Sequence, residues 1–315
     1  MLNTFHLRTF LAVVDSGSYS HAATELHMSQ PAVSQQIRAL EEHLGDIRLF
    51  RRVGQRMVPT MAGEALLHNA RDLVALAIRA EQNILALKGQ VIGQVVVGCT
   101  PNSGERMLPT LLAAFRSGFP AVGLALEVLP GEALITAVSE RRIALMLIEE
   151  PQRRRGWESQ PLGGEALSLI AVAGHPLLQQ EQVPPGMLRE ETFLLPRVGS
   201  ILRRTVEDGL RKRGVPPLDL QVALETDSPA ASLQGVREGL GLAFLPQTCL
   251  PERLGGFGII DLAGQPLQQE WHVARLRERT YPHAANEFFR FLSEQRARDL
   301  LAKLGLRVIA EKEAA

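Results

Sequence analysis

Ser29–Gly45, with the sequence SQPAVSQQIRALEEHLG, is the stretch that decides the fold of the first part of the chain. Ser29 is suited to cap the N-terminus of a helix, and Pro31 falls in the first turn, where its missing N–H group costs nothing. Gly45 stands where helices commonly end. Four aliphatic side chains recur three and four positions apart and form one apolar stripe: Val33, Ile37, Leu40 and Leu44. The stretch therefore predicts an amphipathic helix.

The other side of this predicted helix, near its start, is polar. It carries amides, a hydroxyl and one long cation: Gln30, Gln35, Ser34 and Arg38. Amide and guanidinium groups at the N-terminal end of a helix suit hydrogen bonding to base edges in a major groove of DNA. A second apolar helix is predicted over Tyr19–Leu26, and only the three residues 27–29 separate the two. This arrangement is the plan of a helix-turn-helix.

Two further features belong to the same N-terminal module, which we expect to span residues 1–59. The apolar residues of Phe5–Val14 follow helical spacing and predict a first helix. After the helix-turn-helix, Ile47–Arg52 and Gln55–Pro59 flank a glycine turn and predict two short strands. Residues 48–56 hold four arginines and no acid: Arg48, Arg51, Arg52 and Arg56. We expect a wing that contacts phosphates or a minor groove, a solvated charged face being the alternative.

A long segment with helical periodicity follows at residues 60–89. Seven of its residues alternate three and four positions apart: Leu66, Ala70, Leu73, Ala77, Ala80, Ile84 and Leu87. Sustained for about three heptads, this pattern is typical of a helix that pairs with a partner helix. The alternative is a core helix of the N-terminal module, which we reject because three short helices and a wing offer too little surface to bury it. We predict a dimerisation helix, followed by a hinge at Gly89–Gly93.

Beyond residue 90 the pattern changes to strands alternating with helices, which is typical of an α/β fold. The predicted strands are Val95–Cys99, Leu124–Leu129, Ala144–Ile148, Leu167–Ala173, Phe193–Leu195, Gln221–Leu224 and Leu242–Leu245. The predicted helices between them are Leu108–Phe115, Ala133–Ser139, Arg203–Arg213 and Ala230–Glu238. The chain then crosses back through Asp261–Pro266 to a strand at Trp271–Leu276 and a helix at about His283–Leu304.

The composition limits the class of protein. A chain of 315 residues predicts two or three domains, and equal numbers of basic and acidic residues, 34 each, give no overall basic character. No stretch has the ~18 consecutive apolar residues of a membrane span, and the start lacks the features of a signal peptide, so we expect a cytoplasmic protein without a membrane partner. No metal-ligand spacing or nucleophile–base pair is present. We therefore expect no metal, no cofactor and no enzyme, and we interpret Cys99 as a small buried residue rather than an oxidant sensor.

With these elements in place, the sequence resembles the LysR-type transcriptional regulators over nearly its whole length. Specific N-terminal motifs carry the match: Phe10–Val14, Gly17–Ala23, Leu26–Ser34, Ile37–Glu41 and Thr60–Glu64. A looser match is carried by Gly98–Pro101, Gly174–Pro176, Gly199-Ser200 and Gly239–Ala243. The resemblance implies an α plus α/β architecture, with a winged helix-turn-helix, a dimerising linker helix, and a two-lobed effector domain at 90–305 that is similar to periplasmic binding proteins. Lobe I falls at about 90–163 and 268–305, lobe II at about 164–267, and a tail at 306–315.

The base-reading positions of the family fall on Gln30, Pro31, Ser34 and Gln35, with Arg38 nearby. The candidate DNA-binding residues are Ser29, Gln30, Pro31, Ser34, Gln35, Arg38, Arg51, Arg52 and Arg56. Many members carry arginine where this chain has Gln35. Since arginine pairs well with guanine and glutamine with adenine, we predict a half-site that is shifted toward A·T at that contact.

The candidate effector site follows from the residues and the resemblance together. Thr100, Asn102 and Ser103 come just after the first predicted strand of the α/β part, where a helix N-terminus offers N–H groups to an anion. Family members often place pocket groups at the positions of Thr100, Ser200, Leu202, Thr226 and Asp227, and Leu202 departs from the hydroxyl often found there. Arg197, Arg203 and Arg106 are candidates to pair with a carboxylate or another oxyanion, solvated charge being the alternative. The candidate effector residues are Thr100, Asn102, Ser103, Arg197, Ser200, Leu202, Thr226 and Asp227.

These observations predict a sequence-specific transcriptional regulator that binds double-stranded DNA at an imperfect palindrome, as a dimer or, as is usual in the family, a tetramer. A small-molecule effector, anionic in our interpretation, would bind between two lobes and shift their equilibrium. RNA polymerase is a further candidate partner. The alternatives are a cytoplasmic solute-binding or sensor protein that uses the helix-turn-helix for other contacts, and an enzyme that kept a helix-turn-helix. The N-terminal module argues against the first, and no catalytic group supports the second.

Overall fold

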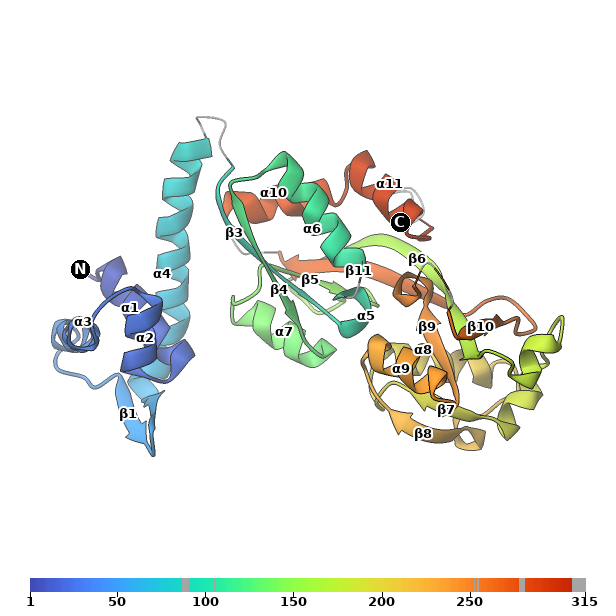
Figure 1. Ribbon diagram of the computed structural model, residues 1–315. Helices are drawn as coiled ribbons and strands as arrows, with labels where there is room; N and C mark the ends of the chain where they lie inside the picture. Colours follow the sequence, from blue (N-terminus) through green and yellow to red (C-terminus); the bar gives the residue numbers. More distant parts are fainter. Residues whose placement is uncertain (87–90, 105, 252, 254, 278–280, 308–315) are drawn as a thin grey trace. The chain divides into compact units, whose positions relative to one another are not determined.

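The computed structural model describes residues 1–86, 91–104, 106–251, 253, 255–277 and 281–307 (Figure 1). The chain forms two compact units. The N-terminal unit comprises Met1–Ile92 with Thr280–His283, and the C-terminal unit comprises Gly93–Arg279 with Ala284–Ala315. No helix in the described ranges is both long and apolar enough to cross a membrane.

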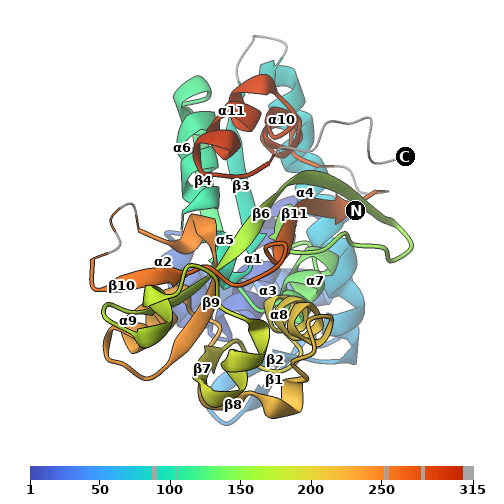
Figure 2. The same cartoon turned by 90° about the vertical axis from the view of Figure 1, so that its right-hand side faces the viewer.

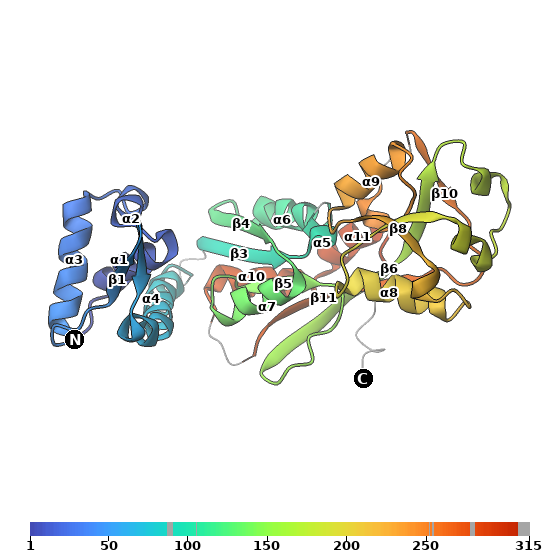
Figure 3. The ribbon, with the colours of Figure 1, turned by 90° about the horizontal axis from the view of Figure 1, so that it is seen from below.

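Three short helices open the N-terminal unit: α1 (Thr4–Ser16), α2 (Tyr19–Glu25) and α3 (Gln30–His43). Each begins at a side chain that accepts a hydrogen bond from the first turn, which is provided in turn by Asn3, Ser18 and Ser29. Their inward faces share one core, built from Leu7, Phe10, Val13, Ala22, Val33, Ile37 and Leu40. Figure 3 shows α3 along its length at one edge of this unit. The predicted helix-turn-helix is confirmed.

The wing is an antiparallel pair, β1 (Phe50–Val53) and β2 (Arg56–Pro59), in which Phe50 lies opposite Pro59. Its first strand begins at Phe50 rather than at Ile47, so the predicted start was too early. The Met57 N–H group donates to the Gly17 carbonyl at 2.8 Å, which ties the wing to the end of α1. Gly17 has a φ of +65°, a conformation that glycine adopts without strain.

The linker helix α4 spans Met61–Ala86, so its predicted extent is close to the observed one. Its first half belongs to the core of the N-terminal unit, because Ala70 and Val74 are buried there and Leu66 packs against the same cluster. An ion pair of 3.1 Å between Arg71 and Asp15 also joins α4 to α1. Rejecting a core role for this helix was therefore wrong for its first half, and Ala70, fully buried within one chain, is unavailable to a partner helix.

The first lobe of the C-terminal unit is a sheet with helices on both faces. Its strands are the parallel β3 (Gly93–Cys99), β4 (Val122–Val128) and β5 (Leu145–Ile148), with the antiparallel β11 (Gln268–Leu276). Its helices are α5 (Pro101–Gly104), α6 (Met107–Gly118), α7 (Gly131–Ser139), α10 (His283–Phe291) and α11 (Gln295–Lys303). Phe115 of α6 packs on Phe288 of α10, with ring centroids 5.0 Å apart. Figure 1 shows α7 on the opposite side of the strands from α6.

The second lobe repeats this layering. Its strands are β7 (Thr192–Leu195), β8 (Gln221–Glu225), β9 (Leu242–Pro246) and β10 (Phe257–Ile260), and its α-helices are α8 (Ile201–Arg211) and α9 (Pro229–Arg237). Short 3₁₀ helices connect them: η1 (Pro176–Gln179), η2 (Pro185–Glu190), η3 (Pro217–Asp219) and η4 (Gln247–Cys249). Phe193 packs in the cluster that contains Leu202 of α8, whereas its neighbour Leu194 packs with Val236 of α9. Alternation along β7 thus places α8 and α9 on opposite faces, as Figures 2 and 3 show.

One long strand, β6 (Trp157–Val172), joins the two lobes. It pairs with β11 over its first part and with β9 and β10 over its last, which gives the sheet order β4-β3-β5-β11-β6-β9-β7-β8. The buried Glu165 of β6 accepts hydrogen bonds from the Thr248 N–H group, the Thr248 hydroxyl and the Trp271 indole. These contacts fix the start of η4 to both crossing strands.

Three predictions about the C-terminal unit were wrong in extent. Only the last part of β6 was predicted, and β10 was missed. The single helix expected at His283–Leu304 is two helices, α10 and α11, with a break between Phe291 and Gln295. Residues 89 and 90 of the predicted hinge at Gly89–Gly93, like Leu87, lie outside the described residues, and Gly93 begins β3.

Candidate functional site

The polar end of α3 is presented to solvent. Ser29 caps the helix, with its hydroxyl oxygen 3.3 Å from the Ala32 N–H group that donates to it. The other candidate residues follow in the first three turns: Gln30, Pro31, Gln35 and Arg38 are exposed, and Ser34 is half-buried. The structure therefore places all six predicted residues in the first three turns of α3 or at its cap, with five of them exposed to solvent.

Glu41, which the sequence analysis did not single out as functional, fixes α3 to the wing. Its carboxylate is buried and accepts from the Leu49 N–H group at 2.8 Å and from the Arg48 guanidinium at 2.9 Å. Leu49 immediately precedes β1. The bond therefore sets where the wing begins relative to the recognition helix. An acid on the apolar side of an amphipathic helix, one residue after Leu40, was the signal in the sequence.

The wing arginines Arg51, Arg52 and Arg56 are exposed. The Arg52 guanidinium donates to the Gly54 carbonyl at 3.1 Å, which orders the turn without covering the charge. Arg48 differs from these three because it pairs with Glu41. The wing thus offers cations beside α3, as phosphate contact requires.

A cleft of about 500 Å³ lies between the two lobes of the C-terminal unit. Lobe I contributes the ends of β3 and β5, the start of α5 and the start of α7. Lobe II contributes the segment from Arg197 to the first turn of α8, and Asp227. Besides Leu202, which belongs mainly to the core, five of the eight predicted effector residues line this cleft: Thr100, Asn102, Arg197, Ser200 and Asp227. The carboxyl ends of parallel strands meet here, which is where α/β proteins commonly bind ligands.

Glu149, at the end of β5, is the cleft residue that the sequence analysis missed. It is only 4% exposed, and its Oε1 accepts from the Thr100 hydroxyl at 2.7 Å and from the Asn102 amide at 3.0 Å. Burial is the largest influence on its pKa and raises it, against the opposing effect of these hydrogen bonds. Thr100 and Asn102 therefore hold the Glu149 side chain in place in addition to lining the cleft. An acid directly after a buried parallel strand was the signal that could have revealed it.

The start of α8 forms the opposite wall. Gly199, with a φ of +92°, turns the chain into Ser200, whose hydroxyl oxygen accepts from the Arg203 N–H group at 3.2 Å. The first N–H groups of a helix are free of intrahelical partners and favour an anion. Ser200 is therefore where it was predicted, and it caps the helix end that faces the cleft.

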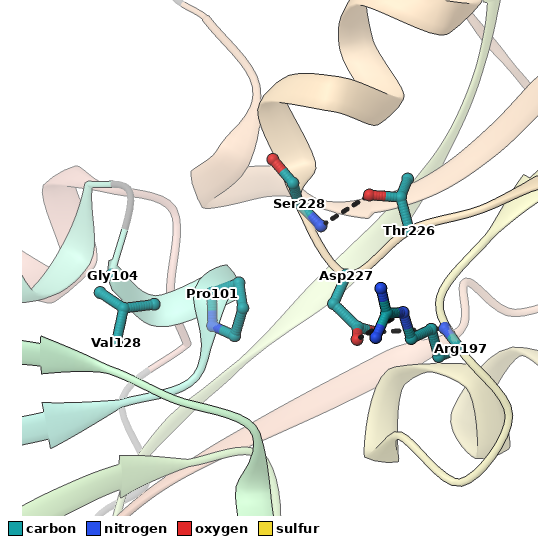
Figure 4. Close-up of a pocket in the computed structure, with 7 residues that line it drawn as sticks. All are labelled: Pro101, Gly104, Val128, Arg197, Thr226, Asp227 and Ser228. Atoms are coloured by element: carbon teal, nitrogen blue, oxygen red, sulfur yellow. Dashed lines mark hydrogen bonds and ion pairs between the residues drawn. The ribbon is translucent and has the colours of Figure 1, made fainter. Parts of the chain in front are cut away.

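A second hollow of about 570 Å³ adjoins the cleft and shares three of its residues, Pro101, Arg197 and Asp227 (Figure 4). The Asp227 carboxylate accepts from the Arg197 N–H group at 3.0 Å and lies 3.9 Å from its guanidinium. Thr226 lines this hollow rather than the cleft, and its hydroxyl accepts from the Ser228 N–H group. Asp227 thus holds the loop that carries Arg197.

Several predicted residues are not available to an effector. Ser103 is fully buried, lines neither hollow and donates to the Thr100 carbonyl. Leu202 touches the cleft but is 2% exposed and belongs to the core of lobe II. Arg203 is buried and bonds to Glu207 and the Pro196 carbonyl, and Arg106 donates to the Leu250 carbonyl. These residues support the site rather than line it.

Cys99 is fully buried, as interpreted, and burial raises the pKa of its thiol to about 12. The neutral thiol is a poor nucleophile, so the residue is unsuited to sensing oxidants.

The second half of α4 carries an apolar face open to solvent. Leu73, Leu76 and Ile84 are exposed, Ile84 to 63%. Ala77 is half-buried and Ala80 is exposed on the same stretch. Leu76 was not predicted, although it completes the spacing between Leu73 and Ala80. This face is the part of the predicted dimerisation surface that remains available.

Comparisons with known proteins fit this geometry. The model of bacterial regulatory helix-turn-helix proteins of the lysR family matches residues 5–64, and that of the LysR substrate binding domain matches residues 88–297. The RuBisCO operon transcriptional regulator of Allochromatium vinosum is 31% identical over 296 residues, which cover 93% of this chain and 96% of that protein.

Solved structures agree with the fold. CbnR, a LysR family transcriptional regulator solved in full length with its target DNA, is 24% identical with a TM-score of 0.67, covering 94% of this chain and all of that one. The regulatory domain of Synechocystis PCC6803 CcmR, in complex with 2-PG, is 25% identical with a TM-score of 0.57, covering 64% of this chain and 95% of that one.

A winged helix-turn-helix joined by a long helix to a two-lobed ligand-binding fold defines a class of DNA-binding regulators that respond to small molecules. The chain belongs to the lysR family of these regulators. Its N-terminal unit is the DNA-binding part, and its C-terminal unit is the effector-binding domain.

Proposed function

We propose that this regulator reads an imperfect palindrome through the N-terminal end of α3 and adjusts that binding to a small anionic effector held between its lobes. The observation that carries the proposal is the exposed polar end of α3 together with the exposed arginines of the wing, in one chain with the inter-lobe cleft. Gln35 would favour adenine at its contact, Ser29, Gln30, Pro31, Ser34 and Arg38 would complete the base and backbone contacts, and the arginines Arg51, Arg52 and Arg56 would bind phosphates.

The effector class is supported by the cleft and by a relative. The cleft contains the N-terminus of α8 and Arg197, both of which favour negative charge. The CcmR domain, which has the same fold, was solved with 2-PG, and curated relatives are named for the RuBisCO operon. We therefore propose 2-PG, or an anion of similar size and chemistry, as the effector, and genes of that kind as targets.

Self-association follows from the exposed apolar face of α4. We propose that Leu73, Leu76, Ala77, Ala80 and Ile84 pair with the same face of a second chain, as the basis of a dimer and of a tetramer. Paired N-terminal units would place two α3 helices in successive major grooves. The same proposal includes contact with RNA polymerase and a location in the cytoplasm, where the chromosome is accessible. It also includes the absence of enzymatic activity.

A path from the cleft to the crossing strands supports transmission of the effector signal. The Asn102 side-chain amide donates to the Glu149 carboxyl. The Asn102 backbone carbonyl accepts from the Cys249 thiol of η4 at 3.2 Å. The preceding residue of η4, Thr248, donates to Glu165 of β6. An effector that closes the lobes would displace the residues joined by these contacts. It can do so only if it binds the closed state with a different affinity from the open state.

Selection of DNA fragments tests the proposal. Purified protein is incubated with fragmented DNA from its source, with and without 2-PG, and the bound fragments are sequenced. The expected result is a narrow set that shares an imperfect palindrome and whose occupancy or footprint changes with 2-PG. Gln35→Arg should shift the preferred base at one half-site position toward guanine, whereas Gln180→Arg, which adds the same charge at an exposed site of lobe II, should not. Random fragments that wash away uniformly with salt would refute the proposal.

A further inference from the structure

The Glu149 carboxyl has one oxygen fully used and one without a partner. Oε1 accepts from both Thr100 and Asn102. Oε2 is buried, and no hydrogen-bond partner reaches it within the part of the chain that the structure describes. A buried polar atom without a partner is costly, so a group that meets this oxygen is expected in the working protein. Glu149 is one of the residues that line the inter-lobe cleft, so an effector bound there lies next to this carboxyl and supplies that group once Oε2 turns toward it.

Among the described residues, no cation pairs with this carboxyl. Arg204, at the other wall of the cleft, pairs with Glu150 at 3.0 Å, and Arg197 pairs with Asp227. An ionised Glu149 would leave a negative charge buried without a counter-charge, which the protein avoids by keeping the proton. The two donors on Oε1 place the proton on Oε2, because an oxygen that accepts two hydrogen bonds acts as the carbonyl of the acid.

We propose that Glu149 carries a proton on Oε2 and, while keeping it, donates a hydrogen bond to an oxygen of a small carboxylate or phosphate effector, so that binding requires the acid form. The proposal rests on the proposed function and names how that site selects its ligand. The anion would be held from two sides, by Oε2–H of Glu149 in lobe I and by the free N–H groups at the start of α8 in lobe II. A neutral acid that donates a hydrogen bond to an anion avoids the repulsion that a carboxylate would impose.

The titratable groups around Glu149 in the described part of the chain lie on four elements and on the opposite wall of the cleft. Its own segment carries Glu150, the start of α7 carries Glu132, which pairs with Arg154, and β3 ends in the neutral Cys99 thiol. On β11, His272 lies in register with Ile148, the residue before Glu149, and its Nε2 is 3.1 Å from Glu270. The remaining groups on the lobe II wall are Arg197, Arg204 and Asp227.

The proposal fixes the pH dependence of effector binding. Burial raises the pKa of Glu149 above the ordinary value, and a bound anion raises it further. Below that pKa the affinity for an anion is constant with respect to this group. Above it, each further pH unit lowers the affinity about tenfold, since one proton must be taken up for each effector bound. A site with an ionised Glu149 that accepts from the effector would show the opposite trend.

Glu149→Gln separates the two states, because the glutamine oxygen accepts from Thr100 and Asn102 while its NH₂ group donates as the acid does. Affinities of the full chain for 2-PG and for inorganic phosphate are measured from acidic to mildly alkaline pH by calorimetry, with tryptophan fluorescence as a second readout. We expect Glu149→Gln to bind within about threefold of the wild type at low pH and to keep only the pH dependence that comes from titration of the ligand itself. Glu149→Ala should bind about 10- to 100-fold more weakly at low pH. Glu181→Gln, which removes an exposed acid of lobe II away from the cleft, should keep the wild-type profile.

Infrared difference spectra between wild type and Glu149→Gln, recorded without effector, provide a measurement that requires neither 2-PG nor phosphate to bind. The carbonyl band of a protonated carboxyl at neutral pH supports the proposal, and a carboxylate band overturns it. Loss of binding in Glu149→Gln, with a pH-independent wild type, also overturns it. A wild type that binds neither 2-PG nor phosphate would instead refute the effector class of the proposed function, and the infrared result would still decide the state of Glu149.

Discussion

Removing the Glu41 carboxylate should destabilise the N-terminal unit and leave the C-terminal unit unchanged. In Glu41→Ala the buried Leu49 N–H group loses an acceptor at 2.8 Å, which costs about 1–3 kcal/mol. The lost pair with Arg48 adds about 0–1 kcal/mol, because the Arg48 side chain is 76% exposed. For a unit of this size each kcal/mol lowers the melting temperature by about 4–8 °C, so we expect a fall of roughly 4–30 °C.

The assay uses the different positions of the chromophores. Both tryptophans, Trp157 and Trp271, lie in the C-terminal unit, so their fluorescence follows only that unit. Scanning calorimetry of the full chain should show the N-terminal transition moving in Glu41→Ala while the tryptophan transition stays in place. Glu41→Gln keeps an acceptor for Leu49 and should lose about 1 kcal/mol or less.

Glu42→Ala, an exposed neighbour on the same helix, is the matched control and should move neither transition. The reasoning is refuted by a Glu41→Ala protein whose N-terminal transition stays within about 2 °C of the wild type, since an unsatisfied buried N–H group cannot cost so little.

Arg51→Ala should reduce the slope of log affinity against log salt by about 0.9 without changing the selected sequence, as equilibrium DNA binding at several salt concentrations will test; a change of sequence preference would contradict phosphate contact. Cys99 should resist iodoacetamide in the native protein and react only on unfolding, since its thiol pKa is about 12; mass spectrometry with Cys249 as the internal comparison checks this, and rapid native labelling would contradict it. Leu76→Glu should lower the mass of the assembly in sedimentation, whereas Leu218→Glu, at an exposed leucine of lobe II, should not; an unchanged mass in Leu76→Glu would remove α4 from the interface.

The sequence was most informative where local signals agree. Over Ser29–Gly45 a cap, a first-turn proline, an apolar stripe and a terminal glycine all indicate the same helix, and α3 has these bounds to within two residues. The parallel strands β3 and β5 were predicted for a similar reason, because each is a short apolar run that is buried on both faces.

Long-range pairing explains what was missed. The first part of β6 contains Pro161 and Gly163, which weaken a strand pattern, yet the segment is held by β11 across a bulge at Trp271 and His272. No feature of the sequence within this segment indicates that β11 is its partner strand. The α4 helix shows the same limit, because its heptad pattern does not reveal which turns pack against α1 of the same chain.

The candidate site was predictable in place but not in chemistry. Thr100, Asn102 and Ser200 were found from their positions after a strand or before a helix, and they line the cleft. Their bonding to a buried Glu149 was not predictable, because an acid pair such as Glu149 and Glu150 reads in sequence as a solvated turn. Only the packing of β5 between its neighbours places the first acid inside and leaves the second at the surface.

The buried acid also predicts how the stability of the C-terminal unit depends on pH. Because its pKa is raised in the folded state, Glu149 keeps its proton in the window between the unfolded and folded pKa values, while the unfolded chain releases it. The stability that this group contributes is therefore complete below the unfolded pKa and is lost as pH rises through the folded pKa, by at most about 1.4 kcal/mol per pH unit. Glu149→Gln has no such proton. Its free energy of unfolding should therefore increase relative to that of the wild type as pH rises.

Urea unfolding followed by tryptophan fluorescence at several pH values measures this difference in the C-terminal unit. Glu165, whose pKa burial also raises, is present in both proteins, so its effect cancels in the comparison. Glu181→Gln, which removes an exposed acid of lobe II, should follow the wild type. A difference between wild type and Glu149→Gln that stays constant with pH would mean that Glu149 titrates alike in the folded and unfolded chains. In that case burial would not control this carboxyl, and the acid form could not be the one that selects the effector.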